Sequence, residues 1–134
     1  MKPLLESSDV KKIGQNIKYD ALVLRRYGVH LGPIAFDTMV AAYLIDPDGG
    51  PFNLETLSRR WLGHDMILFS DVVGKGSGRT TFADVPIEEA QNYACEDADV
   101  TLRLAPLLRE RLEEREGKAV FDMEMPLIEV LLRM

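Results

Sequence analysis

Two pairs of polar residues, each four positions apart, are the first candidates for chemistry. Asn16 and Asp20 fall on one expected helix, and Tyr93 and Asp97 fall on another, so each pair shares a helix face. Carboxylate oxygens suit hard cations such as Mg²⁺ and Mn²⁺, and a tyrosine hydroxyl can position water without being charged at neutral pH. Such spacings are common in helices, so the alternative is a capping Asn, a core-edge Tyr and two solvated acids.

The surroundings of the second pair favour a fixed site. Ala90, Ala94 and Ala98 recur every four residues, which lets the helix approach a sheet closely and hold a carboxylate at a set depth. Two further acids, Glu96 and Asp99, crowd the same turns. This crowding is unfavourable unless a cation or helix capping relieves it.

The bulk composition is that of an ordinary single domain. Of 134 residues, 46% are hydrophobic and 28% are charged, as in globular proteins generally. The formal net charge of −6 argues against tight duplex binding by this chain alone, because phosphates are usually met by clustered Lys and Arg. It does not exclude a nuclease, whose carboxylates hold cations that meet the phosphate.

The cysteine content and the N-terminal residues indicate a cellular location. Cys95 is the single cysteine, which excludes an internal disulfide and a cysteine-based zinc cluster, and we expect it to pack as a small apolar group. The first residues lack the apolar run of a signal peptide, and no stretch is long enough to span a bilayer. We therefore expect a cytoplasmic protein without a membrane partner.

The first third of the chain predicts a small parallel βαβ unit. Residues Val10–Gln15 form a short apolar strand pattern, a helix pattern runs from Asn16 to a glycine stop at Gly28, and Ile34–Phe36 is a second apolar run. Asp37 and Thr38 can cap the next helix.

The rest of the chain predicts helices. Pro86 favours the start of the longest one, which we expect to run to about Arg115. Other predicted segments are a helix over Asn53–Leu62 ended by Gly63, a loop over Gly74–Arg79 and a last helix over Ala119–Met134, with Val120, Met123, Leu127, Val130, Leu131 and Met134 on one apolar side. The predicted fold class is α/β, predominantly helical with about two short parallel strands.

Longer motifs resemble one known family. Lys12–Asp20 (KIGQNIKYD) closely resembles the second motif of the proofreading 3'-5' exonuclease domain of bacterial family A DNA polymerases, and Tyr93–Leu102 (YACEDADVTL) resembles the third. Four further segments look like the family in the same order: Ile34–Met39, Leu57–Leu62, Gly74–Gly76 and Glu124–Leu127, the last resembling the helix that leads into the polymerase domain. The resemblance covers nearly the whole chain.

The resemblance implies roles for the residues of both pairs. Asp20 and Asp97 would be ligands of Mg²⁺ or Mn²⁺, and Tyr93 would orient the attacking water. The residues implied to meet the terminal nucleotide of a single-stranded 3' DNA end are Gln15, Asn16, Tyr19 and Phe69. For Phe69 the implied role is stacking on a frayed base, which tolerates any base, and the alternative is a core Phe beside Ile67 and Leu68.

The resemblance also implies a truncated ribonuclease H-like fold. Residues 1–118 would be a partial exonuclease domain, and residues 119–134 would start the connecting helix toward the polymerase domain. The family's first motif, Asp-x-Glu on the central strand, is expected before Met1, and we expect no Asp-x-Glu within the chain. We therefore expect weak cation binding and little or no activity. The unpaired strand edge favours self-association.

Two other functions stay open at this stage. One is a non-catalytic relic that serves as a scaffold for the adjoining polymerase domain, although retention of Asp20, Tyr93 and Asp97 speaks against it. The other is a related exoribonuclease that trims RNA ends, although the polymerase-like segment Glu124–Leu127 favours DNA.

Overall fold

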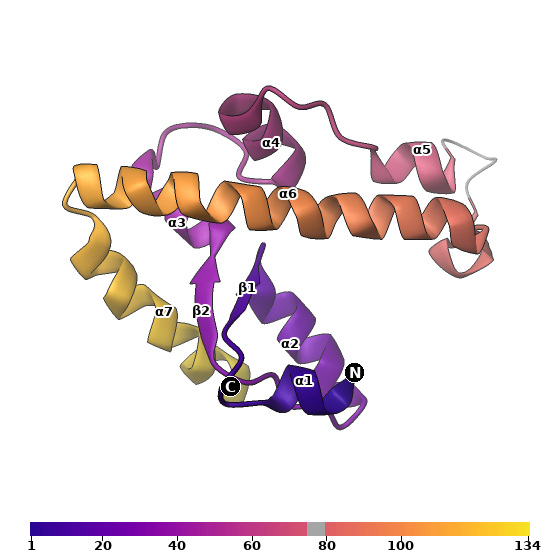
Figure 1. Cartoon of the computed structure of the whole chain (residues 1–134), viewed down its shortest axis with the longest axis horizontal. Helices are drawn as coiled ribbons and strands as arrows, with labels where there is room; N and C mark the ends of the chain where they lie inside the picture. The colour runs from indigo at the N-terminus through magenta and orange to yellow at the C-terminus, as the bar shows by residue number, and fades with distance from the viewer. Residues whose placement is uncertain (75–79) are drawn as a thin grey trace.

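A computed structural model describes residues 1–74 and 80–134 (Figure 1). The predicted loop over Gly74–Arg79 lies outside the described residues except at Gly74. The described elements are α1 (Lys2–Glu6), β1 (Lys12–Gly14), α2 (Ile17–Arg26), β2 (Ile34–Asp37), α3 (Thr38–Ile45), α4 (Leu54–Leu62), α5 (Phe69–Val73), the 3₁₀ helix η2 (Phe82–Asp84), α6 (Ile87–Glu114) and α7 (Lys118–Arg133). None of the described helices is long and apolar enough to cross a membrane.

The predicted βαβ unit is confirmed. Strands β1 and β2 pair in parallel, with Ile13 opposite Phe36 and Gly14 opposite Asp37, and α2 connects them. Both strands are short, and β1 is shorter than the predicted strand over Val10–Gln15. The chain is therefore mostly helical around a two-stranded parallel sheet, as the α/β prediction expected.

The core lies where α6 crosses the sheet. Helix α6 spans the molecule in Figure 1, with α3 and α4 packed along it and α7 returning beside β2. The side chains of Phe36, Leu57, Leu104 and Leu108 are almost completely buried in this region. Burial of such apolar area is the main favourable term in folding, and it fixes α6 against β1 and β2.

One aspartate joins the starts of two helices. Asp37, which is 1% exposed, accepts hydrogen bonds from the backbone N–H groups of Met39 (2.8 Å) and Val40 (3.2 Å) in α3. Its carboxylate also accepts from the N–H groups of Ile17 (2.8 Å) and Asn16 (3.2 Å) at the start of α2. Asp37 thus caps α3 as predicted, and it holds α2 as well, which the sequence did not reveal.

Thr38, which was predicted to cap α3 together with Asp37, has another role. The Thr38 side chain is buried, and its hydroxyl donates to the carbonyl oxygen of Gly14 at 3.2 Å. Asn16 adopts a left-handed backbone (φ 52°), which asparagine tolerates better than most residues. This conformation turns the chain from β1 into α2 where Asp37 receives both N–H groups.

The predicted apolar side of α7 is exposed. It consists of Val120, Met123, Leu127, Val130, Leu131 and Met134. The buried residues are instead Phe121, Ile128 and Leu132, which pack on the sheet and on α2. Because α7 is apolar on more than one side, periodicity alone could not choose the buried face. Cys95 is also exposed rather than packed.

Three short elements escaped prediction. Helices α1 and α5 have five residues each, and η2 has three. Such segments are too short for helical periodicity to be detected.

We predict that Asp37→Ala destabilises the chain by about 3 kcal/mol, because a lost cap and newly unsatisfied buried N–H groups add up. Urea unfolding followed by circular dichroism measures this free energy. Asp37→Asn, which keeps one acceptor oxygen, should lose less. The exposed Asp48 provides the matched control, and equal losses for Asp37→Ala and Asp48→Ala would contradict the double-cap interpretation.

Candidate functional site

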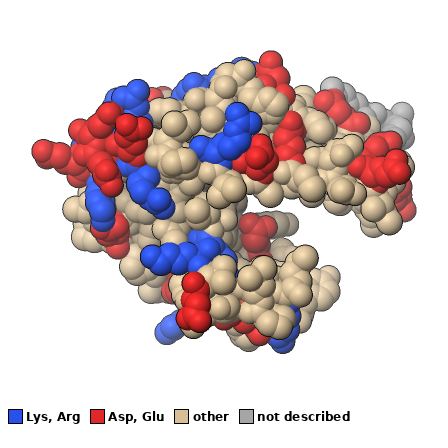
Figure 2. All heavy atoms as spheres, in the orientation of Figure 1, with Lys and Arg blue, Asp and Glu red and all other residues tan. Residues whose placement is uncertain are grey.

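A cavity of about 610 Å³ lies between β1, α2 and α6. Figure 2 shows the molecule hollowed beneath the N-terminal half of α6, on the side facing α2. The cavity is lined by Lys11, Ile13, Gly14, Gln15, Asp20, Leu54, Ala94, Asp97, Ala98, Thr101 and Leu102. The structure therefore brings the two candidate metal-ligand acids, from separate helices, to one cavity.

The first acid, Asp20, lies in the first turn of α2. Partial withdrawal from water raises the pKa of its carboxyl above the usual value, and the negative charge of Asp37 raises it further. The double cap of α2 and α3 therefore also places a second negative charge near the cavity.

The second acid, Asp97, lies one turn after Tyr93 on α6 and is hydrogen-bonded to it. Burial raises the pKa of the Asp97 carboxyl; the hydrogen bond from Tyr93 opposes this, and the charge of Glu96 reinforces it. Burial also raises the pKa of the Tyr93 hydroxyl, and the charge of Asp97 adds to the effect. Tyr93 therefore remains a neutral hydrogen-bonding group at neutral pH.

Of the residues expected to meet the nucleotide backbone, Gln15 lines the cavity. Its side-chain amide donates to the carbonyl oxygen of Phe52 at 2.7 Å, and its side-chain oxygen shares the one Thr38 hydroxyl proton with the carbonyl oxygen of Gly14. Asn16 and Tyr19 are not among the lining residues; Asn16 is fixed by its backbone, and Tyr19 is 65% exposed.

Phe69 belongs to an exposed aromatic cluster. Its ring lies 5.8 Å from that of Phe82 in a stacked arrangement and 6.1 Å from that of Tyr93 in an edge arrangement. Phe82 also meets Tyr93, at 6.0 Å. Phe69 is 42% exposed, so the alternative of a core Phe is wrong. Phe82, from η2, is a member of the cluster that sequence reasoning missed.

The described acids supply only part of a metal site. The described residues contain no group of three or more His, Cys, Asp and Glu side chains arranged to hold a metal. Asp20 and Asp97 offer hard oxygen donors of the right kind, but a divalent cation prefers about six oxygens. Further ligands are needed to complete the shell.

The expectation that the chain contains no Asp-x-Glu is wrong. Asp122-Met123-Glu124 has this spacing, but it lies on α7 rather than on a strand. The Asp122 carboxylate pairs with Lys118 at 2.6 Å on the surface, and Glu124 lines a different cavity, beside α3. Neither acid lines the cavity of Asp20 and Asp97.

Lys11 is a lining residue that the sequence analysis did not select. The alternation of Lys11, Ile13 and Gln15 along the strand pattern was the signal that could have found it. On the face in Figure 2, the described basic and acidic side chains are interspersed without a continuous basic surface. This agrees with the net charge of −6.

Comparisons with known proteins identify the family of the chain. A family model described as 3'-5' exonuclease, for family A DNA polymerases, matches residues 1–113. DNA polymerase I of Rhizobium leguminosarum is 44% identical over 100% of the chain, and that of Pseudomonas aeruginosa is 42% identical over 99%. The chain belongs to the 3'-5' exonuclease family of DNA polymerase I. This exonuclease chain spans only 13% and 15% of those two relatives.

A solved structure shares the fold of the exonuclease chain. The structure described as the POL domain of Pol1 from M. smegmatis, in complex with DNA primer-template and dNTP, matches with a TM-score of 0.76. The match covers 98% of this chain and 20% of that chain, at 20% sequence identity. The fold is therefore similar along almost the entire exonuclease chain, including α7.

We predict that Asp20→Asn stabilises the exonuclease chain at pH 7. Since the pKa of Asp20 is raised in the folded state, the folded chain holds its proton more tightly, and stability falls as pH rises from about 4 through that pKa. Because asparagine does not ionise, the substitution removes this pH-dependent loss of stability. We expect a gain below about 1 kcal/mol, because the carboxyl is partly exposed and screened.

Thermal unfolding at several pH values measures the gain. It should shrink as pH falls below about 4, where the unfolded Asp is also protonated. Added Mn²⁺ should stabilise the unsubstituted chain more than Asp20→Asn. A gain that stays constant down to pH 3 would contradict the assigned cause.

Proposed function

We propose that this chain is the part of a proofreading exonuclease that contributes the second and third motifs to removal of the 3'-terminal nucleotide of DNA. The observation that carries the proposal is that Asp20 of α2 and Asp97 of α6 line one cavity, with Tyr93 bonded to Asp97. These are the types of group that phosphodiester hydrolysis assisted by divalent cations requires.

Asp20 and Asp97 would hold Mg²⁺ or Mn²⁺ in the proposed reaction. Such a cation supplies a more acidic bound water and charge stabilisation at the phosphate. The residues fit this role only in part, because two carboxylates leave most of the coordination shell to water, substrate or another segment. Cation binding to this chain alone is therefore expected to be weak.

Tyr93 would orient the attacking water. Its hydroxyl lies beside Asp97 and stays protonated because its pKa is raised. A neutral hydroxyl held by a carboxylate has a fixed direction, so it can hold a water through its remaining lone pair. Its contacts with Phe69 and Phe82 restrict the ring as well.

The terminal nucleotide would be held by Gln15, Asn16, Tyr19 and Phe69. Gln15 reaches the cavity, and its amide keeps one N–H beyond the bond to Phe52. Phe69 and Tyr19 both expose aromatic surface, and aromatic stacking accepts all four bases. A single-stranded end suits such surfaces because its bases are free to splay.

The complete domain would have a ribonuclease H-like sheet. Strand β1 pairs with β2 on one edge, and its residues Ile13 and Gly14 line the cavity. We propose that a strand with the Asp-x-Glu motif pairs there and adds the missing carboxylates. Residues 1–118 would then be the partial exonuclease domain, and residues 119–134 would lead toward an adjoining polymerase domain. A cytoplasmic location follows from such a role in bacteria.

The two alternative functions are a non-catalytic scaffold and an RNA-trimming exonuclease. A non-catalytic scaffold does not require Asp20, Tyr93 and Asp97 to converge, so their arrangement favours a catalytic lineage. An RNA-trimming exonuclease could use the same cavity. The DNA polymerase I relatives favour DNA.

We predict that the 134-residue chain digests single-stranded DNA little or not at all, even at saturating Mn²⁺, because too few carboxylates hold the cation. Joining an upstream segment with the Asp-x-Glu strand of a relative should give activity. Asp20→Ala or Asp97→Ala should then lower that activity by about a hundredfold or more. Release of 3'-terminal nucleotides from labelled DNA and RNA oligonucleotides measures it.

Asp48→Ala is the matched control, since it removes an exposed acid away from the cavity. Robust digestion by the unextended chain would refute the proposed dependence on the first motif. Preference for RNA would select the exoribonuclease alternative.

We predict that the isolated chain self-associates through the open edge of β1, because unpaired strand groups recruit other strands. Sedimentation velocity over a range of concentrations measures this. Leu131→Glu, on the exposed side of α7, separates that surface from the strand edge. A clean monomer at high concentration would rule out self-association.

A further inference from the structure

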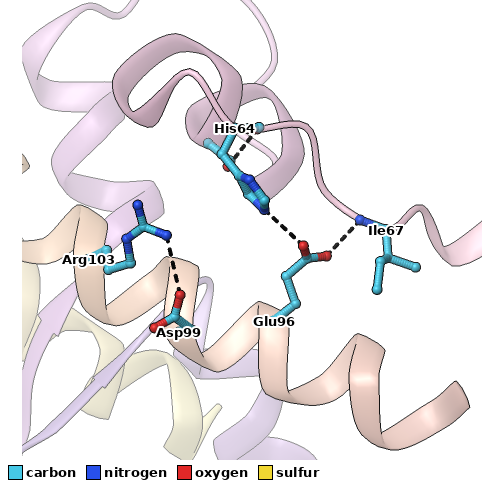
Figure 3. A network of polar contacts seen from close by, with 6 residues as sticks. His64, Ile67, Glu96, Asp99 and Arg103 are labelled. Carbon is cyan, nitrogen blue, oxygen red and sulfur yellow. Dashed lines mark hydrogen bonds and ion pairs between the residues drawn. The ribbon is translucent and has the colours of Figure 1, made fainter. Parts of the chain in front are cut away.

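A short strap connects α4 to α5 and lies over α6. We define the strap as residues 64–68. The Glu96 carboxylate of α6 holds it at two points (Figure 3). One oxygen lies 2.8 Å from Nε2 of His64, and the other accepts from the backbone N–H of Ile67 at 2.6 Å. The Glu96 side chain is 19% exposed, so water competes only weakly for these bonds.

The start of the strap is fixed to the core. The hydroxyl of Ser58, which is fully buried in α4, donates to the carbonyl oxygen of His64 at 2.8 Å. Leu57, the preceding residue, is buried in the main core. The strap therefore leaves a rigid helix and is then held on α6 by Glu96.

The end of the strap leads directly into Phe69. Phe69 is the first residue of α5, a five-residue helix in which Val73 is the buried member. Phe69 directly follows the strap in the chain, so the strap and the contacts of α5 with α6 together place it. Its ring lies against Tyr93, which precedes Glu96 by three residues on α6.

We propose that Glu96 and His64 are positioning residues that hold Phe69 against Tyr93, and thereby set the surface on which the terminal base stacks. The proposal rests on the proposed function for the stacking itself. One rigid helix carries both the anchor, Glu96, and the residue that Phe69 must meet, Tyr93. A carboxylate suits the anchor because its two oxygens can accept from two separate donors.

The test uses the 134-residue chain with Glu96→Ala, Phe69→Ala and the double substitution. Binding of a single-stranded oligothymidylate is measured by NMR titration, together with the ring-proton shifts of Phe69, Phe82 and Tyr93. We expect Glu96→Ala and Phe69→Ala each to weaken binding about tenfold, the usual size of one base–aromatic stack. The double variant should be no weaker than Phe69→Ala, since both act on one contact.

Asp99→Ala is the matched control. It removes the same charge from the same helix, and Asp99 pairs with Arg103 at 3.4 Å without a bond to the strap in the described network (Figure 3). We expect Asp99→Ala to leave the Phe69 ring shifts unchanged. Glu96→Gln should restore most of the binding, because its amide keeps an acceptor for Ile67 and a donor for His64.

Three outcomes would overturn the proposal. They are unchanged Phe69 ring shifts in Glu96→Ala, additive losses in the double variant, and an equal effect of Asp99→Ala. If the unsubstituted chain does not bind oligothymidylate, the stacking function fails, and the ring shifts of Glu96→Ala still decide whether the strap positions Phe69. Thermal unfolding of each variant separates displacement of the ring from loss of the fold.

Discussion

The buried carboxylate of Asp37 is the interaction on which the rest of the structure depends. It receives N–H groups from the starts of α2 and α3 at once, so it fixes the direction of both helices as they leave the sheet. The positive ends of two helix dipoles stabilise its charge. Burial raises the pKa of Asp20, and the charge of Asp37 raises it further. A residue that organises the fold thus also contributes to the electrostatics of the cavity.

The site residues come from different parts of the fold. Asp20 lies on α2, whose start is held by Asp37 at the end of β2, whereas Asp97 and Tyr93 lie on α6. Phe69 and Phe82 pack against Tyr93 and form an aromatic cluster with it. The structure thus brings acids from two distant segments of the sequence to one cavity.

Much of the fold followed from local sequence signals. The parallel βαβ unit, the cap at Asp37 and the end of α4 at Gly63, which has φ 63°, were predictable because turn and capping chemistry is local. The buried face of α7 was not, because only the tertiary partner decides which apolar side turns inward. Convergence of Asp20 with Asp97 was expected from the resemblance, while Lys11 and the bond between His64 and Glu96 depend on contacts between distant segments.

The length of α6 has a mechanical consequence. Its 28 residues extend about 42 Å, and its buried side chains begin only at Val100. Tyr93 and Asp97 therefore lie beyond the part of α6 that the main core covers. That end of the helix is held instead by α5 and by the bonds of Glu96 to His64 and Ile67. The position of the cavity wall at Asp97 thus depends on these peripheral contacts as well as on the core.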